Sequence, residues 1–409
     1  WTSMNKRERF TLVAGAFLFL AATVFAAFDK AEAAGEWTLN DRCPAGFAPD
    51  SKGLCRLVSL YREYPSLQDR GMGGLKIGLP TVRDGFSPQQ IDLGRLLFFD
   101  PLLSGNGQVS CASCHQPEKG FADGLPRSVG AQGIEVTRSA PSLWNAGLQE
   151  IYFWDGRAES LEQQMAGPLY DKKEMGSSPQ HLLEVLNENE AYPGLFRQAF
   201  PSDPGGVTLD QVYTAIAAFE SSLVSLNSRY DYYAHGVHEA LTADEIAGLN
   251  IFRSFVARCA ECHTPPLFSN QQIAVLGTPE PEGRPLDAGR EAVTGDPSHR
   301  GGFKVPSLRN ITKTAPYMHS GRFETLRETV AFYTGGRGHA VPEGEELSIH
   351  WHIWEPQLTE EELDRLVDFL AALDDESYMP ETPDRLPSGL PLVHMESPQR
   401  AGEIAHASP

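Results

Sequence analysis

The sequence contains the motif Cys-x-x-Cys-His twice, and this repetition constrains the fold more than any other feature. The two copies consist of Cys111, Cys114 and His115, and of Cys259, Cys262 and His263. Each copy follows a predicted helix with a capping box, which begins after Ser87 in one half and after Thr242 in the other. A proline follows two residues after each histidine, at Pro117 and Pro265. A helix, a motif and a proline turn that recur together predict a duplicated structural unit.

Three kinds of site use closely spaced cysteine and histidine residues: zinc sites, redox dithiols and covalent haem attachment sites. A structural zinc site needs four ligands, and neither copy has a second cysteine pair or an HxxxH pair nearby. The βαβ pattern of a thioredoxin-type dithiol is absent. In a c-type haem, both thiols bond to the vinyl groups and the histidine binds the iron. We therefore predict two c-type haems, with His115 and His263 as iron ligands. His350 and His352 could also bind a metal, but a single HxH pair is more often a surface feature.

The first 33 residues have the pattern of a secretory signal peptide. Lys6, Arg7 and Arg9 precede an apolar run, and Ala31 and Ala33 form an Ala-x-Ala cleavage site. This pattern predicts export to the periplasm. The alternative is an uncleaved anchor, because the apolar run approaches the length of a membrane-spanning helix. No later segment is apolar enough to span a membrane, so we expect no membrane contact after cleavage.

The composition is that of a soluble globular protein with more than one domain. The chain has 409 residues, of which 41% are hydrophobic and 22% charged. Its net charge of −20 disfavours nucleic acid and anionic lipid as partners. Cys43 and Cys55 lie outside the motifs, and in an exported chain we expect a disulfide between them. The alternative is two free thiols, which an oxidising compartment disfavours.

The predicted secondary structure is helical, with long loops rich in glycine and proline. The segments 208–226 and 358–373 are amphipathic, and strand-like alternation is scarce. We predict a mainly α fold of two cytochrome c-like haem domains related by duplication. The expected order is an N-terminal extension (34–79), an N-terminal haem domain (80–235), a C-terminal haem domain (236–380) and an extended tail (381–409).

Two long segments, "FWDGRAESLEQQMAGPLYDKKEMG" and "KVPSLRNITKTAPYMHSGRFETL", resemble the bacterial di-haem cytochrome c peroxidase family. The resemblance runs from about Pro80 to Leu373, through both predicted haem domains. It implies that His115 holds a peroxide-reacting haem, with Gln164 and Glu174 lining its open side. It also implies that Pro168 packs beside that site, that Glu174 moves the peroxide proton, and that Trp154 relays electrons between the haems. Any of these residues taken alone would be interpreted as an ordinary core or surface residue.

The chain departs from the typical members of this family in two places. The loop 121–139 contains no histidine, whereas typical members cap the resting first haem with one there. The resemblance therefore implies a first haem that stays five-coordinate and open. Tyr333 stands where typical members place the methionine ligand of the second haem, and its spacing to Leu326 and Val330 predicts that it faces inward. A phenolate ligand stabilises high-valent iron and lowers its reduction potential.

This combination resembles the MauG and MbnH branch of the family. Such enzymes use H₂O₂ to store two oxidising equivalents on both haems and then oxidise residues of a protein partner. MauG-like proteins have a tryptophan where this chain has Ala257. The resemblance therefore favours an MbnH-like oxidation of a partner tryptophan over completion of a tryptophan-derived quinone.

Members of the family also hold a Ca²⁺ between the haems. Thr314 and Pro316 match its carbonyl donors, and Ser139 stands where the common pattern has asparagine, with Asn145 nearby. Hard oxygen donors of this kind suit Ca²⁺. The resemblance therefore implies a calcium site built from these four residues.

Three functions compete at this point. The first is H₂O₂-dependent oxidation of aromatic residues in a protein partner. The second is a detoxifying peroxidase that takes electrons from a small cytochrome or cupredoxin, and the third is a di-haem electron carrier. The histidine-free loop and Tyr333 favour the first over the second, and the expected pocket of Gln164, Pro168 and Glu174 disfavours the third.

Overall fold

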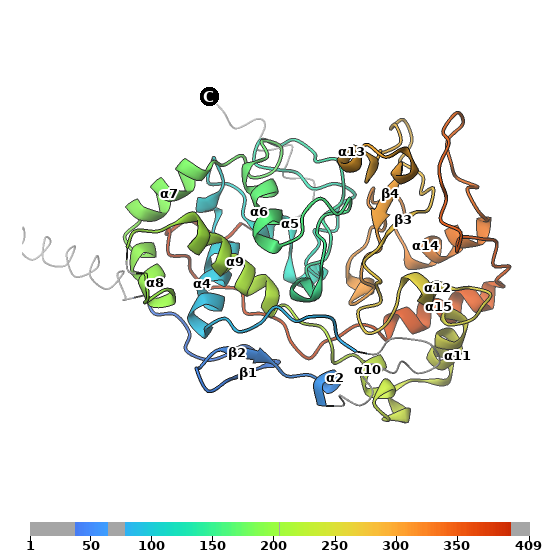
Figure 1. Ribbon diagram of the computed structural model, residues 1–409, viewed down its shortest axis with the longest axis horizontal. Coiled ribbons are helices and arrows are strands. Elements are labelled where there is room, and N and C mark those ends of the chain that lie inside the picture. Colours follow the sequence, from blue (N-terminus) through green and yellow to red (C-terminus); the bar gives the residue numbers. More distant parts are fainter. Residues whose placement is uncertain (1–36, 64–77, 204, 394–409) are drawn as a thin grey trace, which may run out of the picture. The chain divides into compact units, whose positions relative to one another are not determined.

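The computed structural model describes residues 37–63, 78–203 and 205–393 (Figure 1). The predicted signal peptide lies outside the described residues. Within those ranges, none of the helices has the length and apolar character needed to cross a membrane. The described residues from Leu39 onward form one compact unit, so the two predicted haem domains are packed together within it.

The fold is mainly helical, as predicted. The N-terminal half contains α2 (Leu60–Glu63), α4 (Pro88–Phe99), α5 (Cys111–Cys114), α6 (Leu161–Tyr170), α7 (Pro179–Glu188), α8 (Tyr192–Ala199), α9 (Leu209–Ser222) and α10 (Arg229–Ala234). The C-terminal half contains α11 (Ala243–Phe252), α12 (Cys259–Cys262), α13 (Glu291–Thr294), α14 (Leu326–Phe332) and α15 (Glu360–Ala371). Short 3₁₀ turns are η2 (Pro101–Leu103), η3 (Pro117–Lys119), η4 (Ala146–Leu148), η5 (His238–Ala240), η6 (Pro297–His299), η7 (Ile311–Lys313) and η8 (Tyr333–Gly335).

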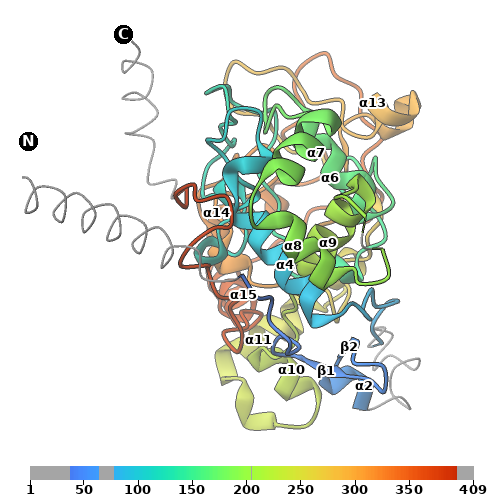
Figure 2. The ribbon, with the colours of Figure 1, turned by 90° about the vertical axis from the view of Figure 1, so that its left-hand side faces the viewer.

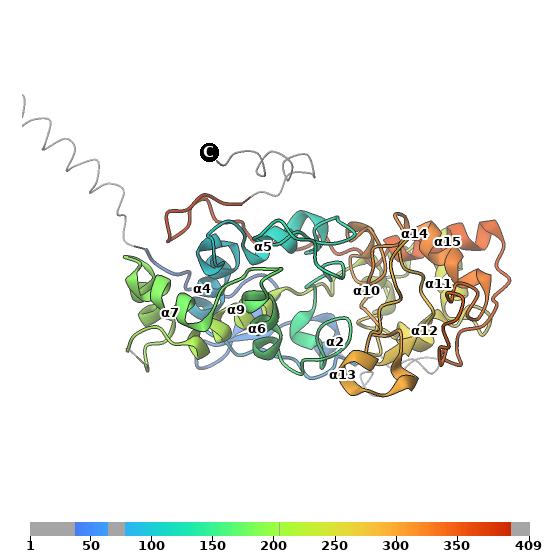
Figure 3. The same ribbon diagram turned by 90° about the horizontal axis from the view of Figure 1, so that it is seen from above.

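The two halves repeat one helix arrangement. In each half, a capped helix precedes the motif and packs against a later helix of the same half: α4 against α9, and α11 against α15 (Figures 2 and 3). Both predicted capping boxes are present, at Ser87 with Gln90 and at Thr242 with Glu245. The duplication seen in the sequence therefore corresponds to two copies of the same helix pair.

In each helix pair, a glycine allows the backbones of the two helices to come into direct contact. A Cβ atom on Gly94 would lie 1.8 Å from the carbonyl oxygen of Ala215 in α9. A Cβ atom on Gly248 would lie 1.9 Å from the carbonyl oxygen of Arg365 in α15. Both distances are far shorter than any contact a real side chain makes, so each crossing requires glycine.

Gly94→Ala should destabilise the protein, whereas Gly194→Ala in α8 should not. Overpacking a tight contact costs about 1–3 kcal/mol. A methyl group at Gly194 would meet no atom closer than 3.8 Å, and alanine there favours the helix by about 0.5–1 kcal/mol. Thermal unfolding should therefore show Tm shifts of opposite sign. An unchanged Tm for Gly94→Ala would show that the two helices separate at little cost.

Within the described residues, four short strands form two antiparallel pairs that the sequence pattern does not indicate. The strand β1 (Phe47–Pro49) pairs with β2 (Cys55–Leu57), and β3 (Ile273–Val275) pairs with β4 (Gly302–Lys304). Cys43 and Cys55 form a disulfide beside the first pair. Three-residue strands carry too little alternation to be read from a sequence.

Residues 381–393 form no helix or strand and pack against the N-terminal half. Leu386 is 3% exposed and lies in a core cluster with Phe98, Phe121 and Phe219. The backbone N–H of Ser388 also donates to the buried carboxylate of Asp100. As far as residue 393, the predicted tail is thus extended but forms part of the core of the first half.

Candidate haem-binding and peroxide site

Each Cys-x-x-Cys-His motif forms one turn of helix that ends at its histidine. The turn is closed by a hydrogen bond from the histidine N–H to the carbonyl of the first cysteine, 2.9 Å long after α5 and 2.8 Å after α12. The two cysteines and the histidine of each copy are therefore held on one short rigid element. All six residues line the same cavity.

Both histidine rings are held by a backbone carbonyl. Nδ1 of His115 lies 2.8 Å from the carbonyl oxygen of Phe121, and Nδ1 of His263 lies 3.0 Å from that of Phe268. A carbonyl only accepts hydrogen bonds, so Nδ1 carries the proton and Nε2 keeps its lone pair. Burial lowers the pKa of both histidines, which favours the neutral form. This is the state in which an imidazole binds a metal.

The two acceptor residues share an unusual backbone conformation. Phe121 has φ of 61° and Phe268 has φ of 54°, in the left-handed region that bulky residues rarely occupy. Both side chains are 0% exposed, and this packing holds the conformation that turns each carbonyl toward its histidine. The sequence shows a phenylalanine after each motif, but it does not show this backbone geometry.

The cavity measures about 440 Å³ and takes its walls from both halves. Its lining includes apolar residues from the two helix pairs, such as Ile216, Phe252 and Leu366. The four motif cysteines are not disulfide-bonded. Two free thiols next to a neutral imidazole on an apolar wall, present twice, are the donor set of a c-type haem. The residues therefore fit two haems.

Gln164, Pro168 and Glu174 meet on the wall of this cavity. Gln164 and Pro168 lie in α6, and Glu174 lies in the turn that follows this helix. Pro168 has no N–H, so α6 lacks the hydrogen bond to the carbonyl of Gln164. The structure thus brings together the three residues that the resemblance assigns to the open side of the first haem.

The histidine-free loop packs directly on the turn that contains Glu174. The N–H of Ala131 donates to the carbonyl of Glu174 at 2.7 Å. A Cβ atom on Gly130 would lie 1.9 Å from the carbonyl oxygen of Lys173, so only glycine permits this approach. Burial raises the pKa of the Glu174 carboxyl, and the charge of Asp171 raises it further. The carboxyl is therefore suited to taking up a proton.

Trp154 connects the two halves at the cavity wall. Its Nε1–H donates to the carbonyl of Ser139 at 2.9 Å, and its own carbonyl accepts from the N–H of Lys304 in β4 at 2.7 Å. The indole also lies edge-on to His319. These contacts fix the ring among residues from both halves, as an electron relay between two haems would require.

Tyr333 lies at the end of α14, on the part of the cavity wall formed by the C-terminal half. Burial raises the pKa of its phenol, and the nearby Cys259 and Cys262 raise it further. Among the described residues, none forms a hydrogen bond with its hydroxyl. Buried hydroxyls are usually paired, so an unpaired one beside the second motif suits an iron ligand.

The four residues predicted to bind Ca²⁺ do not all come together. Thr314, Pro316 and Ser139 line the cavity, but the Ser139 carbonyl is used by Trp154. Asn145 is not among the residues that line the cavity. Its carboxamide instead pairs with both backbone polar groups of Ser225, at 3.0 and 2.9 Å, just after the end of α9. The Asn145 side chain therefore does not fit a calcium site.

His350 and His352 lie next to the second motif. Among the described residues, they form with Cys262 the one group of three side chains close enough to hold a metal. A haem thioether at Cys262 would remove that thiol, and Nε2 of His352 already lies 3.0 Å from the Glu261 carboxylate. The pair is thus better described as part of the haem surroundings than as a separate metal site.

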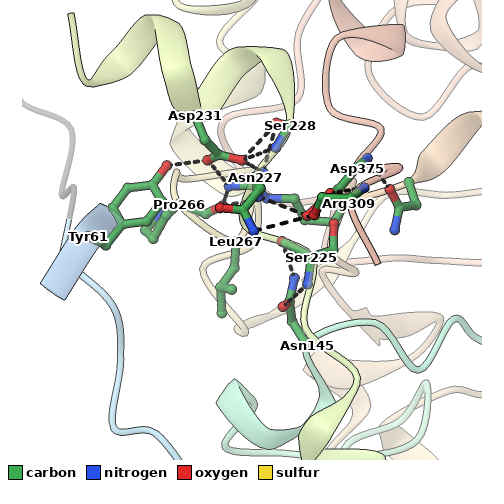
Figure 4. Close-up of polar contacts among 12 residues, drawn as sticks. Tyr61, Asn145, Ser225, Asn227, Ser228, Asp231, Pro266, Leu267, Arg309 and Asp375 are labelled. Atoms are coloured by element: carbon green, nitrogen blue, oxygen red, sulfur yellow. Dashed lines mark hydrogen bonds and ion pairs between the residues drawn. The ribbon is translucent and has the colours of Figure 1, made fainter. Parts of the chain in front are cut away.

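A buried ion pair supports the loop after the second motif (Figure 4). Arg309 is 1% exposed, and its guanidinium donates to both oxygens of Asp231, at 2.6 and 2.7 Å. It also donates to the carbonyl of Pro266, two residues before Phe268. Tyr61 donates to Asp231 from the N-terminal extension. No sequence pattern indicates this network, because its members are far apart in the chain.

The chain is similar in sequence and in structure to proteins of one family. The sequence model for di-haem cytochrome c peroxidase matches residues 88–239. Cytochrome c551 peroxidase of Nitrosomonas europaea is 39% identical over 240 residues, which are 58% of this chain and 71% of that protein. The methylamine utilization protein MauG of Methylorubrum extorquens is 36% identical over 288 residues, 70% of this chain and 78% of MauG. A crystal structure of a MauG-like protein associated with microbial copper homeostasis aligns with a TM-score of 0.66 and 32% identity, covering 76% of this chain and 96% of that one.

Proposed function

The chain belongs to the di-haem cytochrome c peroxidase family, which includes MauG, and from this membership we propose that it uses H₂O₂ to oxidise a protein partner. As a member, it is a haem-dependent oxidoreductase with two c-type haems. The observation that carries the proposal is Tyr333. Its phenol lies beside Cys259 and Cys262 on the cavity wall and has no hydrogen-bond partner among the described residues. A tyrosine ligand at the second haem suits an enzyme that holds oxidising equivalents.

The motif residues would hold the haems, with His115 and His263 as proximal ligands. When bound, the haems would supply the iron chemistry needed to reduce peroxide and to hold its two oxidising equivalents. Glu174 takes the proton from H₂O₂ and returns it to the leaving oxygen, and Gln164 orients the peroxide by hydrogen bonding. Pro168 keeps an apolar wall beside them, and Trp154 carries electrons between the halves.

The oxidation of the partner must supply the two electrons that reduce one molecule of H₂O₂. An MbnH-like reaction would replace a ring hydrogen of a partner tryptophan by a hydroxyl group, with the oxygen taken from water. The two electrons and two protons that are released reduce H₂O₂ to two molecules of water. We place this chemistry in the periplasm, because of the signal-peptide pattern at the N-terminus. Ca²⁺ at the carbonyls of Thr314 and Pro316 is a further part of the proposal, and no step is assigned to it.

Peroxide added to the fully oxidised holoprotein, without an electron donor, should change the absorbance of both haems. Tyr333→Met should preserve the fold and haem content but shorten the lifetime of the oxidised state, because the phenolate that stabilises it is lost. Stopped-flow absorbance measures this lifetime, and Tyr232→Met on the exposed face of α10 serves as the control. A wild-type protein that reacts with peroxide only after one-electron reduction would contradict the proposal.

A detoxifying peroxidase is the second candidate. It is favoured by the 39% identity to the Nitrosomonas cytochrome c551 peroxidase. Such an enzyme would reduce H₂O₂ to water with electrons from a small cytochrome or cupredoxin. Rapid turnover of a reduced cytochrome, with no covalent change in any partner protein, would support this function instead.

A further inference from the structure

Two segments beside the second motif expose large apolar side chains. Phe255 is 82% exposed and Val256 is 51% exposed, just before Cys259. Trp351 is 66% exposed and Trp354 is 44% exposed, in the loop between α14 and α15. We call these four residues the aromatic surface. Tryptophan is enriched at the centres of protein interfaces, and its exposure in a cluster marks a contact site.

The aromatic surface is joined directly to the wall of the haem cavity. Nε1 of Trp354 donates to the carbonyl of Val256 at 2.8 Å. The guanidinium carbon of Arg258 lies 4.3 Å from the centre of the Trp354 ring and 6.0 Å from that of Phe255. Arg258 itself lines the cavity. Arg258 thus lies between the exposed indole of Trp354 and the part of the cavity beside Cys259.

Trp351 has a second connection, through His352. The two ring centres are 3.6 Å apart. His352 lines the cavity, and one of its ring nitrogens lies within 4.8 Å of the Cys262 sulfur. Both indoles are therefore one residue away from the second haem attachment site. An exposed, oxidisable ring at this short distance provides a route for electrons between the cavity and a docked protein.

The compensated charges at the centre of the aromatic surface and the net charge of the chain indicate the kind of partner that fits. Glu261 pairs with His352 at 3.0 Å and lies 3.9 Å from Arg258, so the charges at the centre are already compensated. The chain as a whole carries a net charge of −20. A complementary partner would therefore be apolar at its contact centre and basic around it, with its approach steered by charge.

We propose that the aromatic surface docks the protein partner, and that Trp351 and Trp354 pass its electrons to the cavity wall. This inference rests on the proposed function and adds the place and the residues of contact. Two electrons leave the partner one at a time through the indoles. They reach H₂O₂, which takes up two protons and forms two molecules of water.

Docking is tested with the holoenzyme and a small basic c-type cytochrome as the probe. The double variant Trp351→Ala/Trp354→Ala should raise the Kd by about 30-fold or more, as expected for interface hot spots. Calorimetry at low salt measures the Kd, and Tyr232→Ala, another exposed aromatic residue, should leave it unchanged. An unchanged Kd in the double variant would overturn the proposal. So would a wild-type dimer that the same substitutions dissociate, because the surface would then join two copies of this chain.

The electron route is tested with Trp351→Phe/Trp354→Phe, which keeps apolar rings but removes the oxidisable indoles. The Kd should stay near the wild-type value, while peroxide-dependent oxidation of the bound cytochrome slows by about tenfold or more, a barrier increase of about 1.4 kcal/mol. Without a cytochrome, mass spectrometry should find oxygen added to Trp351 or Trp354 of the wild type. An unchanged oxidation rate would refute the relay. The haem absorbance change on peroxide addition is recorded separately and reports on the proposed function itself.

Discussion

Glu174→Gln should slow the reaction of the oxidised holoprotein with H₂O₂ by roughly 10²–10⁴-fold, the usual effect of losing a positioned proton shuttle. The carboxyl lies on the cavity wall, and its pKa is raised by burial and by Asp171. An amide of the same size leaves the backbone contacts with the histidine-free loop in place but cannot take up a proton. Stopped-flow absorbance of the haems, measured against peroxide concentration, gives the rate constant.

The matched control for this change is Glu159→Gln. Glu159 is an exposed carboxylate just before α6 and does not line the cavity. The Glu159→Gln variant should react with peroxide at the wild-type rate. Equal rates for Glu174→Gln and the wild type would assign the proton to another group, and Gln164 would then be left without a partner carboxylate in its proposed role.

Arg309→Met should reduce the free energy of unfolding by about 3–5 kcal/mol, because it leaves the buried carboxylate of Asp231 without a counter-charge. The midpoint of urea unfolding, followed by circular dichroism, measures the loss. The double variant Arg309→Met/Asp231→Leu should recover most of it, since apolar residues can replace a buried ion pair at little cost. If the double variant is as unstable as the single one, the loss of stability comes from the Pro266 carbonyl, which no longer accepts hydrogen bonds from Arg309.

Acid should remove the contribution of this ion pair. Burial raises the pKa of Asp231, but Arg309 and the hydrogen bonds from Tyr61 and Ser228 outweigh burial, so the pKa lies below the ordinary 3.8. A lowered carboxyl pKa stabilises the folded protein above the ordinary pKa, and this contribution is lost as the pH falls through the folded-state value. The wild type should therefore lose stability relative to the double variant only below about pH 4.

The features that the sequence predicted correctly are local ones. The capping boxes at Ser87 and Thr242 depend on residues three positions apart. The assignment of the haem-attachment residues, which stays a prediction, rests on the five consecutive letters of each motif. The placement of Gln164, Glu174 and Tyr333 on one cavity required the family resemblance, because these residues are far apart in the chain.

The features that the sequence did not predict depend on tertiary contacts. Arg309 and Asp231 are 78 positions apart, and nothing in either segment indicates that a charged pair will be buried. The left-handed conformation of Phe121 and Phe268 is imposed by the packing of their side chains. Asn145 was assigned to calcium from its neighbourhood in the sequence, but its carboxamide is bound to the backbone of Ser225.

The packing of Leu386 against Phe98, Phe121 and Phe219 affects the order in which the protein folds. The helices α4 to α9 come early in the chain, yet one core position of that half is filled by a residue near the other end. In the C-terminal half, the helix pair of α11 and α15 is complete at Ala371, where α15 ends. The half that comes first in the chain is therefore the last to be completed, and its phenylalanine cluster stays open to water until Leu386 packs against it.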